Sequence, residues 1–209
     1  MAEYELIYHA GIPGRGEFIR LLFEASATPY HDSALNEGQA AIKPYLDGSF
    51  EGNDENPTPF APPILKHGQV VVSQTSNILL YLATHLENPI DLSPPATRSS
   101  SEPSPAKKAK PSRDDTTLAT HLFHVNSLAL TILDLNNEAH DTHHPISVAS
   151  YYEDQRDAAV DKAKDFRANR VPKFFAYFEN LLGRDGAQEW LVGTTASYAD
   201  LCLFQVVDG

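Results

Sequence analysis

A segment rich in serine and proline, from Asn88 to Ser112, divides this chain into two parts with different sequence patterns. Its composition buries too little apolar surface to order itself, and it is longer than most connections inside a compact domain. With 209 residues in all, the chain has enough length for a core on either side of it. We therefore predict a domain over residues 1–88, a low-complexity linker over 89–115 and a second domain over 116–209.

The first part alternates stretches that are typical of strands and helices. Tyr4 to His9 and Tyr30 to Leu35 predict strands, separated by an amphipathic helix from Arg15 to Ser26. The spacing of its apolar residues predicts an inner helix face made of Phe18, Leu21, Leu22 and Ala25. A hairpin that turns at Gly68 and another helix follow. The order β-α-β-β-β-α predicts a small α/β domain on a four-stranded sheet.

The second part predicts helices throughout. Helical spacing indicates one long helix with a buried stripe made of Leu118, Leu122, Val125, Ala129, Ile132 and Leu133. A second long helix is expected from about Glu153 to Leu182, bent or interrupted at Pro172. Near the end, Ser197 and Asp200 predict a capping box, with aspartate in place of the usual glutamate. We therefore predict an all-α domain.

Composition excludes several classes of function. The formal net charge of −12 argues against binding to nucleic acid, and it means that an anionic ligand needs local donors. No apolar run is long enough to span a bilayer, and charges stand where a signal peptide carries its apolar stretch. Cys202 is the only cysteine, so an intrachain disulfide is impossible. We expect a cytoplasmic protein that binds neither nucleic acid nor membrane.

Tyr8 is the first candidate for chemistry. It ends the predicted opening strand, just before the turn from Gly11 to Gly14 and the start of a helix. In open α/β sheets, ligands bind outside the carboxyl ends of the strands, so this position fits a site. A core tyrosine with a satisfied hydroxyl fits the same position equally well.

Pro62-Pro63 is the second candidate, directly before the predicted strand at Ile64. A cis bond before the second proline would turn an edge of backbone outward, where an extended peptide can pair with it. An ordinary proline-rich loop end is the alternative interpretation.

The segment from Ser73 to Asn77 is the third candidate, because it opens a helix. The small polar side chains of Gln74 and Thr75, beside free backbone N–H groups, form a natural site for a carboxylate. Plain N-capping explains the same residues. The spacing of the three candidates, rather than any one of them, points to a common site.

Together these residues resemble the cytosolic glutathione transferase family, in its tyrosine-type branch. That family's strand ending in tyrosine and its Gly-Arg-x-Glu-x-x-Arg helix correspond here to Tyr8 and the run from Gly14 to Arg20. Its cis-proline corresponds to Pro63, and its Gln-Ser pair to Gln74 and Thr75. Trp190-Leu191-Val192-Gly193 and the capping box are similar to its helical domain, and Glu138 to Gln155 is similar to a bacterial and fungal subgroup.

The resemblance implies a thioredoxin-like domain followed by an all-α domain, with glutathione as cosubstrate and a small hydrophobic electrophile as second substrate. Tyr8 would be the catalytic residue, donating a hydrogen bond that favours the thiolate of glutathione. The resemblance further implies a homodimer and a role in detoxification. The residues implied in glutathione binding are Arg15, Lys43, Pro62, Pro63, Gln74 and Thr75.

Three features depart from the family pattern. Pro62 has no N–H to offer a bound peptide, and the linker is unusually long. The family continues with further helices beyond the position of Gly209, so the resemblance predicts an incomplete helical domain. These departures leave two alternatives open: a noncatalytic binding or regulatory protein, and a glutathione-dependent isomerase or ether-cleaving enzyme.

His140, Asp141, His143 and His144 have a spacing that a metal site can use. A structural zinc site needs four well-placed ligands, so we predict no metal here and expect these residues to cap a helix end or face the substrate. Cys202 lies in an apolar helix, where we expect an inert buried thiol.

Overall fold

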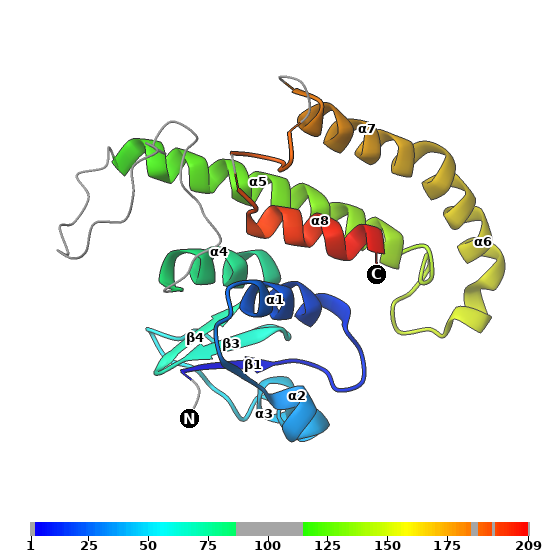
Figure 1. Ribbon diagram of the computed structural model, residues 1–209. Helices are drawn as coiled ribbons and strands as arrows, with labels where there is room; N and C mark the ends of the chain where they lie inside the picture. The colour runs from blue at the N-terminus through cyan, green and yellow to red at the C-terminus, as the bar shows by residue number, and fades with distance from the viewer. Residues whose placement is uncertain (1–2, 87–114, 185–187, 194, 209) are drawn as a thin grey trace. The chain divides into compact units, whose positions relative to one another are not determined.

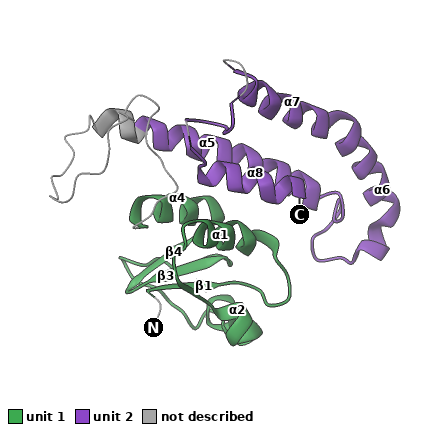
Figure 2. Ribbon diagram, viewed as in Figure 1, with its two compact units in different colours: residues 1–91 green, residues 92–209 purple. Residues whose placement is uncertain are grey.

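The computed structural model describes residues 3–86, 115–184, 188–193 and 195–208 (Figure 1). The chain divides into two compact units, residues 1–91 and residues 92–209 (Figure 2). The predicted linker lies outside the described residues except for Asp115. Among the helices in the described ranges, none combines the length and the apolar character needed to cross a membrane.

Unit 1 is built on a mixed sheet of four strands in the order β2-β1-β3-β4. β1 runs parallel to β2, and the helix α1 (Gly14–Ala25) forms the crossover that a parallel pair requires. β3 is antiparallel to both β1 and β4. With α4 (Thr75–His85) the predicted order β-α-β-β-β-α is confirmed. The strands are β1 (Tyr4–Ile7), β2 (Tyr30–Asp32), β3 (Ile64–His67) and β4 (Val70–Ser73).

Two layers of apolar side chains cover the sheet. α1 and α4 lie side by side on one face (Figure 1) and bury Phe18, Ile19 and Leu22 together with Ile78, Leu79 and Leu82. Ile7 and Ile64 form a second cluster with Ile42, which directly precedes α3. This cluster anchors the connection between β2 and β3, whose short helices are α2 (Ser33–Asn36), η1 (Gly38–Ala40) and α3 (Lys43–Leu46).

Three predicted details of unit 1 are wrong. β1 ends at Ile7 rather than at His9. Ile19 and Phe23 are buried while Ala25 is exposed, because α1 contacts both the sheet and α4 and therefore buries a wider face than one stripe. β2 ends at Asp32 rather than at Leu35, since the Asp32 carboxylate accepts a hydrogen bond from the Ala34 amide at 3.0 Å and starts α2.

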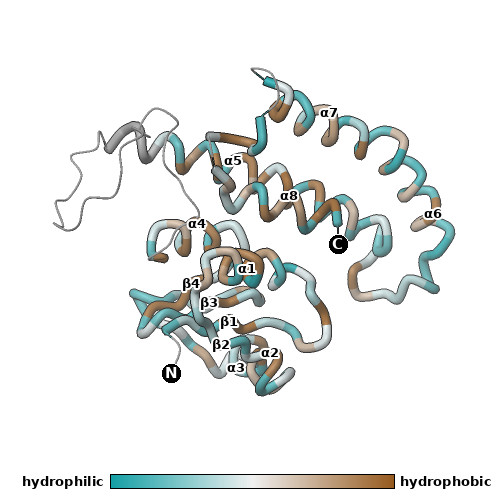
Figure 3. Tube along the Cα trace, viewed as in Figure 1, coloured by the Kyte–Doolittle hydropathy of each residue, from teal (hydrophilic) through white to brown (hydrophobic). Residues whose placement is uncertain are grey.

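Unit 2 consists of helices in its described part. α5 (Asp115–His140) and α8 (Tyr198–Asp208) pack against each other, and Figure 3 shows apolar residues along much of α8. Val125, Ala129 and Ile132 of the predicted stripe are buried, while Leu122 and Leu133 are half-buried. On α8 the buried residues are Tyr198, Ala199 and Cys202.

The second long helix is interrupted as predicted, near Pro172. α6 (Arg156–Asp165) passes into a π-helical segment, η4 (Phe166–Arg170), before α7 (Val171–Leu182) begins. Proline lacks the N–H that a continuous ladder needs, and it lies here in the first turn of α7, where that donor has no intrahelical partner.

Asp200 ties the start of α8 to the loop before it. Its carboxylate accepts hydrogen bonds from the amides of Ser197 and Leu191, each at 2.8 Å. The predicted bond from the aspartate to the serine amide is thus confirmed. Ser197 Oγ also donates to Asp200 Oδ2 at 2.7 Å, and the Asp200 amide donates to the Ser197 carbonyl at 3.1 Å. The cap by the serine side chain itself stays a prediction.

Gln155 organises the loop that follows α5. It lies at the end of η3 (Tyr152–Gln155) and is 5% exposed. Its Oε1 accepts from the amides of Ile146 and Ser147, and its Nε2 donates to three carbonyls, those of Ser147, Ser150 and Tyr151. One buried amide side chain therefore closes a loop whose own apolar residues point to solvent, among them Ile146 and Tyr151.

Candidate active site

Three of the predicted site residues lie in a row at one end of the sheet. Ile7 stands opposite Ile64 in the β1–β3 pair, and Ile64 stands opposite Ser73 in the β3–β4 pair. One residue further along these ladders come Tyr8, Pro63 and Gln74. The register therefore brings together three segments that are far apart in the sequence.

Two glycines of α1 make room for the ring of Tyr8, which is 6% exposed. A Cβ atom on Gly16 would lie 2.7 Å from Cδ1 of the ring, and one on Gly14 would lie 2.5 Å from the hydroxyl oxygen. Gly14 also has φ +44°, which side chains rarely tolerate. The close approach of α1 to Tyr8 thus requires glycine at both positions.

The hydroxyl of Tyr8 is held at the N-terminus of α1. The amide of Arg15 donates to it at 2.8 Å. Because this bond uses a lone pair of the oxygen, the hydroxyl proton is left for donation to a further acceptor. The ring belongs to the core, as one interpretation of the sequence expected. The oxygen nevertheless lies at a helix end that favours negative charge.

The Pro62-Pro63 bond is cis, as the resemblance implied for Pro63. Pro63 is buried and Pro62 is half-buried. Neither residue carries an N–H, so the backbone of this pair offers only carbonyl oxygens to a ligand.

The backbone at the start of α4 is unusual. Gln74 has φ 73°, a conformation that costs about 1–3 kcal/mol for a non-glycine residue, and its side chain makes no capping bond. The plain N-capping interpretation is therefore wrong for Gln74. Thr75 is 5% exposed, and its Oγ1 has no hydrogen-bond partner among the described residues. A buried hydroxyl without a partner costs about 1–3 kcal/mol, which is recovered when a ligand supplies one.

The two predicted cationic residues lie on the surface. Lys43 is the exposed first residue of α3, and it follows Ile42, which packs against Ile7 and Ile64 at the same end of the sheet. Arg15 is also exposed, and the contact with Tyr8 comes from its amide. Lys43 thus follows directly after a residue of the cluster that Ile42 forms with Ile7 and Ile64.

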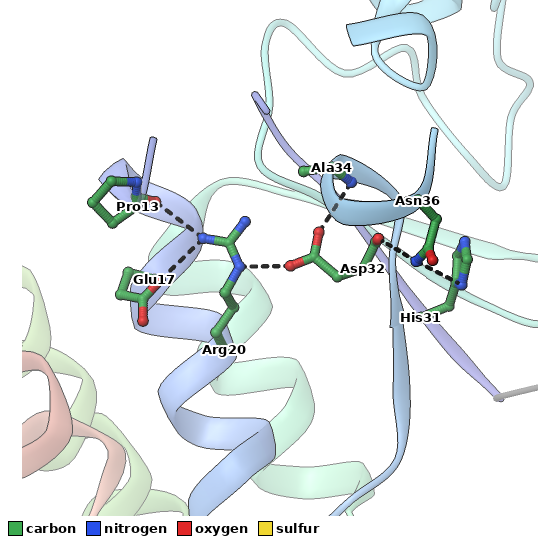
Figure 4. A network of polar contacts seen from close by, with 7 residues as sticks. All are labelled: Pro13, Glu17, Arg20, His31, Asp32, Ala34 and Asn36. Atoms are coloured by element: carbon green, nitrogen blue, oxygen red, sulfur yellow. Dashed lines mark hydrogen bonds and ion pairs between the residues drawn. The ribbon is translucent and has the colours of Figure 1, made fainter. Parts of the chain in front are cut away.

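Arg20 is a residue whose role the sequence did not reveal. Figure 4 shows it between α1 and the end of β2, where its Nε donates to Asp32 Oδ2 at 2.6 Å. Its terminal nitrogen donates to Glu17 at 3.0 Å and to the Pro13 carbonyl at 3.2 Å. The guanidinium carbon also lies 5.9 Å from the centre of the Tyr8 ring. Glu17 and Arg20 both belong to the Gly-Arg-x-Glu-x-x-Arg run noted in the sequence, but that motif does not show which groups Arg20 joins.

The histidine cluster and the cysteine belong to unit 2. The described residues contain no group of three or more ligands arranged for a metal ion, and His140 contacts Asp141 at 3.5 Å. Cys202 is fully buried, and this burial raises the pKa of its thiol. A thiol of this kind is a poor nucleophile.

Unit 2 has a cleft of its own between α5 and the segment from η4 to α7. Its volume is about 540 Å³, and Glu138 and Arg170 join its two walls by a bidentate ion pair at 2.6 and 2.7 Å. The hydrogen bonds from Arg170 hold the pKa of the Glu138 carboxyl below its usual range. The remaining lining includes Asp134, Lys173, Phe174 and Tyr177.

Comparison with known proteins connects this geometry to one fold. The family model described as the glutathione S-transferase C-terminal domain matches residues 140–209. Among curated proteins, none matches this chain.

Solved structures give the same connection over the whole chain. A nematode-specific GST of C. elegans is 20% identical, with a TM-score of 0.62, and the match covers 100% of this chain and 81% of that one. The Pi-class glutathione S-transferase of Onchocerca volvulus is 20% identical, with a TM-score of 0.60, and the match covers 99% of this chain and 76% of that one. Rat hPGDS complexed with a quinoline is 18% identical, with a TM-score of 0.59, and the match covers 98% of this chain and 79% of that one. The chain therefore has the glutathione S-transferase fold, and the predicted fold class is confirmed.

Proposed function

We propose that this protein is a glutathione transferase of the tyrosine type, in which Tyr8 activates the thiol of glutathione. The observation that carries the proposal is the hydrogen bond from the Arg15 amide to the Tyr8 hydroxyl at 2.8 Å. It fixes the phenol oxygen and leaves its proton for donation. A sulfur atom beside the Tyr8–Pro63–Gln74 row would be the acceptor.

The same row supports a position for the rest of glutathione. The γ-glutamyl carboxylate would lie at the N-terminus of α4. The first-turn amides of that helix would donate there, together with the Thr75 hydroxyl, which has no partner within the described ranges. The Pro62 carbonyl would accept from the cysteinyl amide. Lys43 would meet the glycyl carboxylate, and the exposed Arg15 would supply further positive charge. Such local donors would allow an anionic ligand to bind although the net charge of the chain is −12.

The chemistry follows from the acidity of a thiol. A free cysteine thiol has a pKa of about 8.5, so near neutral pH most of it is protonated and a weak nucleophile. A hydrogen bond from Tyr8 stabilises the thiolate, and the thiol proton leaves to water. The thiolate then forms a sulfur–carbon bond with the electrophile, whose leaving group departs with the bonding electron pair.

The finer parts of the proposal concern the second substrate and the setting. The electrophile would be small and hydrophobic, and the protein would be a cytoplasmic homodimer that acts in detoxification and belongs to a bacterial and fungal subgroup of the family. The similarity of the stretch from Glu138 to Gln155 to that subgroup supports this assignment.

Substitution of Tyr8 by Phe tests the proposal. A hydrogen bond to a charged group contributes about 1.5–3 kcal/mol, so kcat/KM for 1-chloro-2,4-dinitrobenzene should fall roughly 10- to 100-fold. The ultraviolet absorbance of bound thiolate should be lost at the same time. Tyr177→Phe, in the cleft of unit 2, is the matched control. Glutathione binding without any turnover in the unaltered protein would contradict a transferase and support a binding protein.

A further inference from the structure

Arg20 lies beside the ring of Tyr8 and joins three separate parts of unit 1. Its partners are Asp32 at the end of β2, Glu17 on α1 and the carbonyl of Pro13 before α1. Asp32 is itself fixed, since its second carboxylate oxygen accepts from the Ala34 amide and its carbonyl accepts from Asn36 (Figure 4). Arg20 is therefore held rigidly at its inner end.

The contact with Pro13 is the one that reaches the candidate site. Pro13 and Gly14 form the turn that leads directly to the Arg15 amide, the donor to the Tyr8 hydroxyl. The Pro13 carbonyl accepts from Arg20 at 3.2 Å and from the Glu17 amide at 3.1 Å. Two donors thus fix the orientation of this peptide, and with it the direction of the amide that follows.

Charge alone does not explain the arrangement. The guanidinium carbon lies 5.9 Å from the centre of the Tyr8 ring, but two carboxylates, Asp32 and Glu17, pair with this one cation. The cluster therefore carries no excess positive charge with which to attract a thiolate. What the flat guanidinium provides is a set of donors in fixed directions, which the single ammonium of lysine cannot reproduce.

We propose that Arg20 is a positioning residue, which holds the Pro13–Gly14 turn so that the Arg15 amide is aimed at the Tyr8 hydroxyl. The role of Tyr8 itself rests on the function proposed above. Arg20 acts at a distance from glutathione, through the backbone of the turn.

The Arg15 amide signal in a ¹H–¹⁵N correlation spectrum of the ligand-free protein tests this directly. Tyr8→Phe removes the acceptor and defines the signal of a free amide. Arg20→Gln and Arg20→Lys should both move the Arg15 signal most of the way to that position. Glu17→Gln is the control: it changes one side-chain partner of Arg20 but leaves the contacts with Pro13 and Asp32. The Arg15 signal of this variant should stay at its original position.

A double variant separates the loss of positioning from a loss of folding. Arg20→Gln leaves the buried Asp32 carboxylate unpaired, whereas Arg20→Gln with Asp32→Asn removes that charge and keeps an oxygen for the Ala34 amide. With saturating glutathione, this double variant should lose roughly 5- to 20-fold in kcat, with KM for glutathione changed less than about twofold.

Two results would overturn the role of Arg20. One is an Arg15 signal that stays in place in the folded double variant, and the other is a full return to the original signal with Arg20→Lys. Neither depends on glutathione, so they remain distinct from a failure of the transferase proposal, which would appear as missing glutathione binding by the unaltered protein.

Discussion

Gly16 lies so close to the ring of Tyr8 that any side chain there would overlap it. A Cβ atom on Gly16 would be 2.7 Å from Cδ1 and 2.8 Å from Cγ of the ring. The nearest atoms belong to the part of the ring beside its own Cβ, which cannot swing away as a flexible tip can. The position of the phenol is therefore determined by an absent side chain as much as by its hydrogen bond.

Substitution of Gly16 by Ala should push Tyr8 out of place. Overpacking of this kind costs about 1–3 kcal/mol, so we expect a lower free energy of unfolding in urea and a loss of transferase activity. The control is the same substitution in a Tyr8→Ala background, where the overlap is gone. A double-mutant cycle with no coupling between the two positions would contradict this account.

Substitution of Thr75 by Val should have opposite effects on stability and on binding. Without ligand the Thr75 hydroxyl is buried and unpaired among the described residues, so its removal should be neutral or slightly stabilising. If the hydroxyl binds a carboxylate of glutathione, the dissociation constant should rise about tenfold.

Calorimetric titration and thermal unfolding measure the two effects of Thr75→Val. Thr84→Val is the control, because Thr84 lies on the same helix with its hydroxyl bonded to the Tyr81 carbonyl at 2.8 Å. Equal glutathione affinity for the original protein and Thr75→Val would exclude this hydroxyl from the site.

Substitution of Pro62 by Val should strengthen glutathione binding. Valine restores the N–H that Pro62 lacks, and one hydrogen bond contributes about 0.5–1.5 kcal/mol. We expect the dissociation constant to fall roughly 2- to 10-fold in a calorimetric titration. An unaltered affinity would mean that no carbonyl of the bound peptide accepts a hydrogen bond from residue 62.

The Glu138–Arg170 pair predicts a pH dependence of stability in unit 2. Its hydrogen bonds lower the pKa of Glu138 in the folded chain below the ordinary value of 4.5, so the folded state binds the proton less readily than the unfolded state. The stabilisation is therefore complete above that ordinary value and is lost as the pH falls through the lowered pKa.

Thermal unfolding of the original protein and of Glu138→Gln checks this sign. Near pH 7 the variant should unfold at a temperature roughly 1–3 °C lower, since partly exposed pairs contribute little. The difference should shrink as the pH is lowered to about 3. A difference that stays constant over this range would show that the charge of Glu138 is not what matters.

Most of the architecture could be predicted from spacing, and the errors have physical causes. Tyr8, Pro63 and Gln74 were candidates because they end or begin strands and helices, and sheet register turns such positions into neighbours. The end of β2 was missed because the Asp32 side chain caps a helix that propensity does not show. The inner face of α1 was misjudged because a helix with two neighbours buries more than one stripe.

The candidate site was predictable in its residue types but not in its geometry. Nothing in the sequence shows that Thr75 Oγ1 has no hydrogen-bond partner in the described part of the chain or that Gln74 has φ 73°. Both depend on how the β4–α4 corner is closed in three dimensions. The link from Arg20 to Pro13 was hidden for the same reason, because its two ends meet only when the turn and the helix are both formed.

Gln155 holds the loop that follows α5 in place, although the apolar residues of that loop are exposed to solvent. Five bonds from one buried side chain hold the backbone of residues 146–151, while Ile146 and Tyr151 are 75% and 78% exposed. We therefore expect the backbone of this segment to be rigid although some of its side chains are exposed to solvent. In deuterated water the amides of Ile146 and Ser147 should exchange as slowly as those of a helix, and the apolar tip should hold a single shape toward whatever meets it.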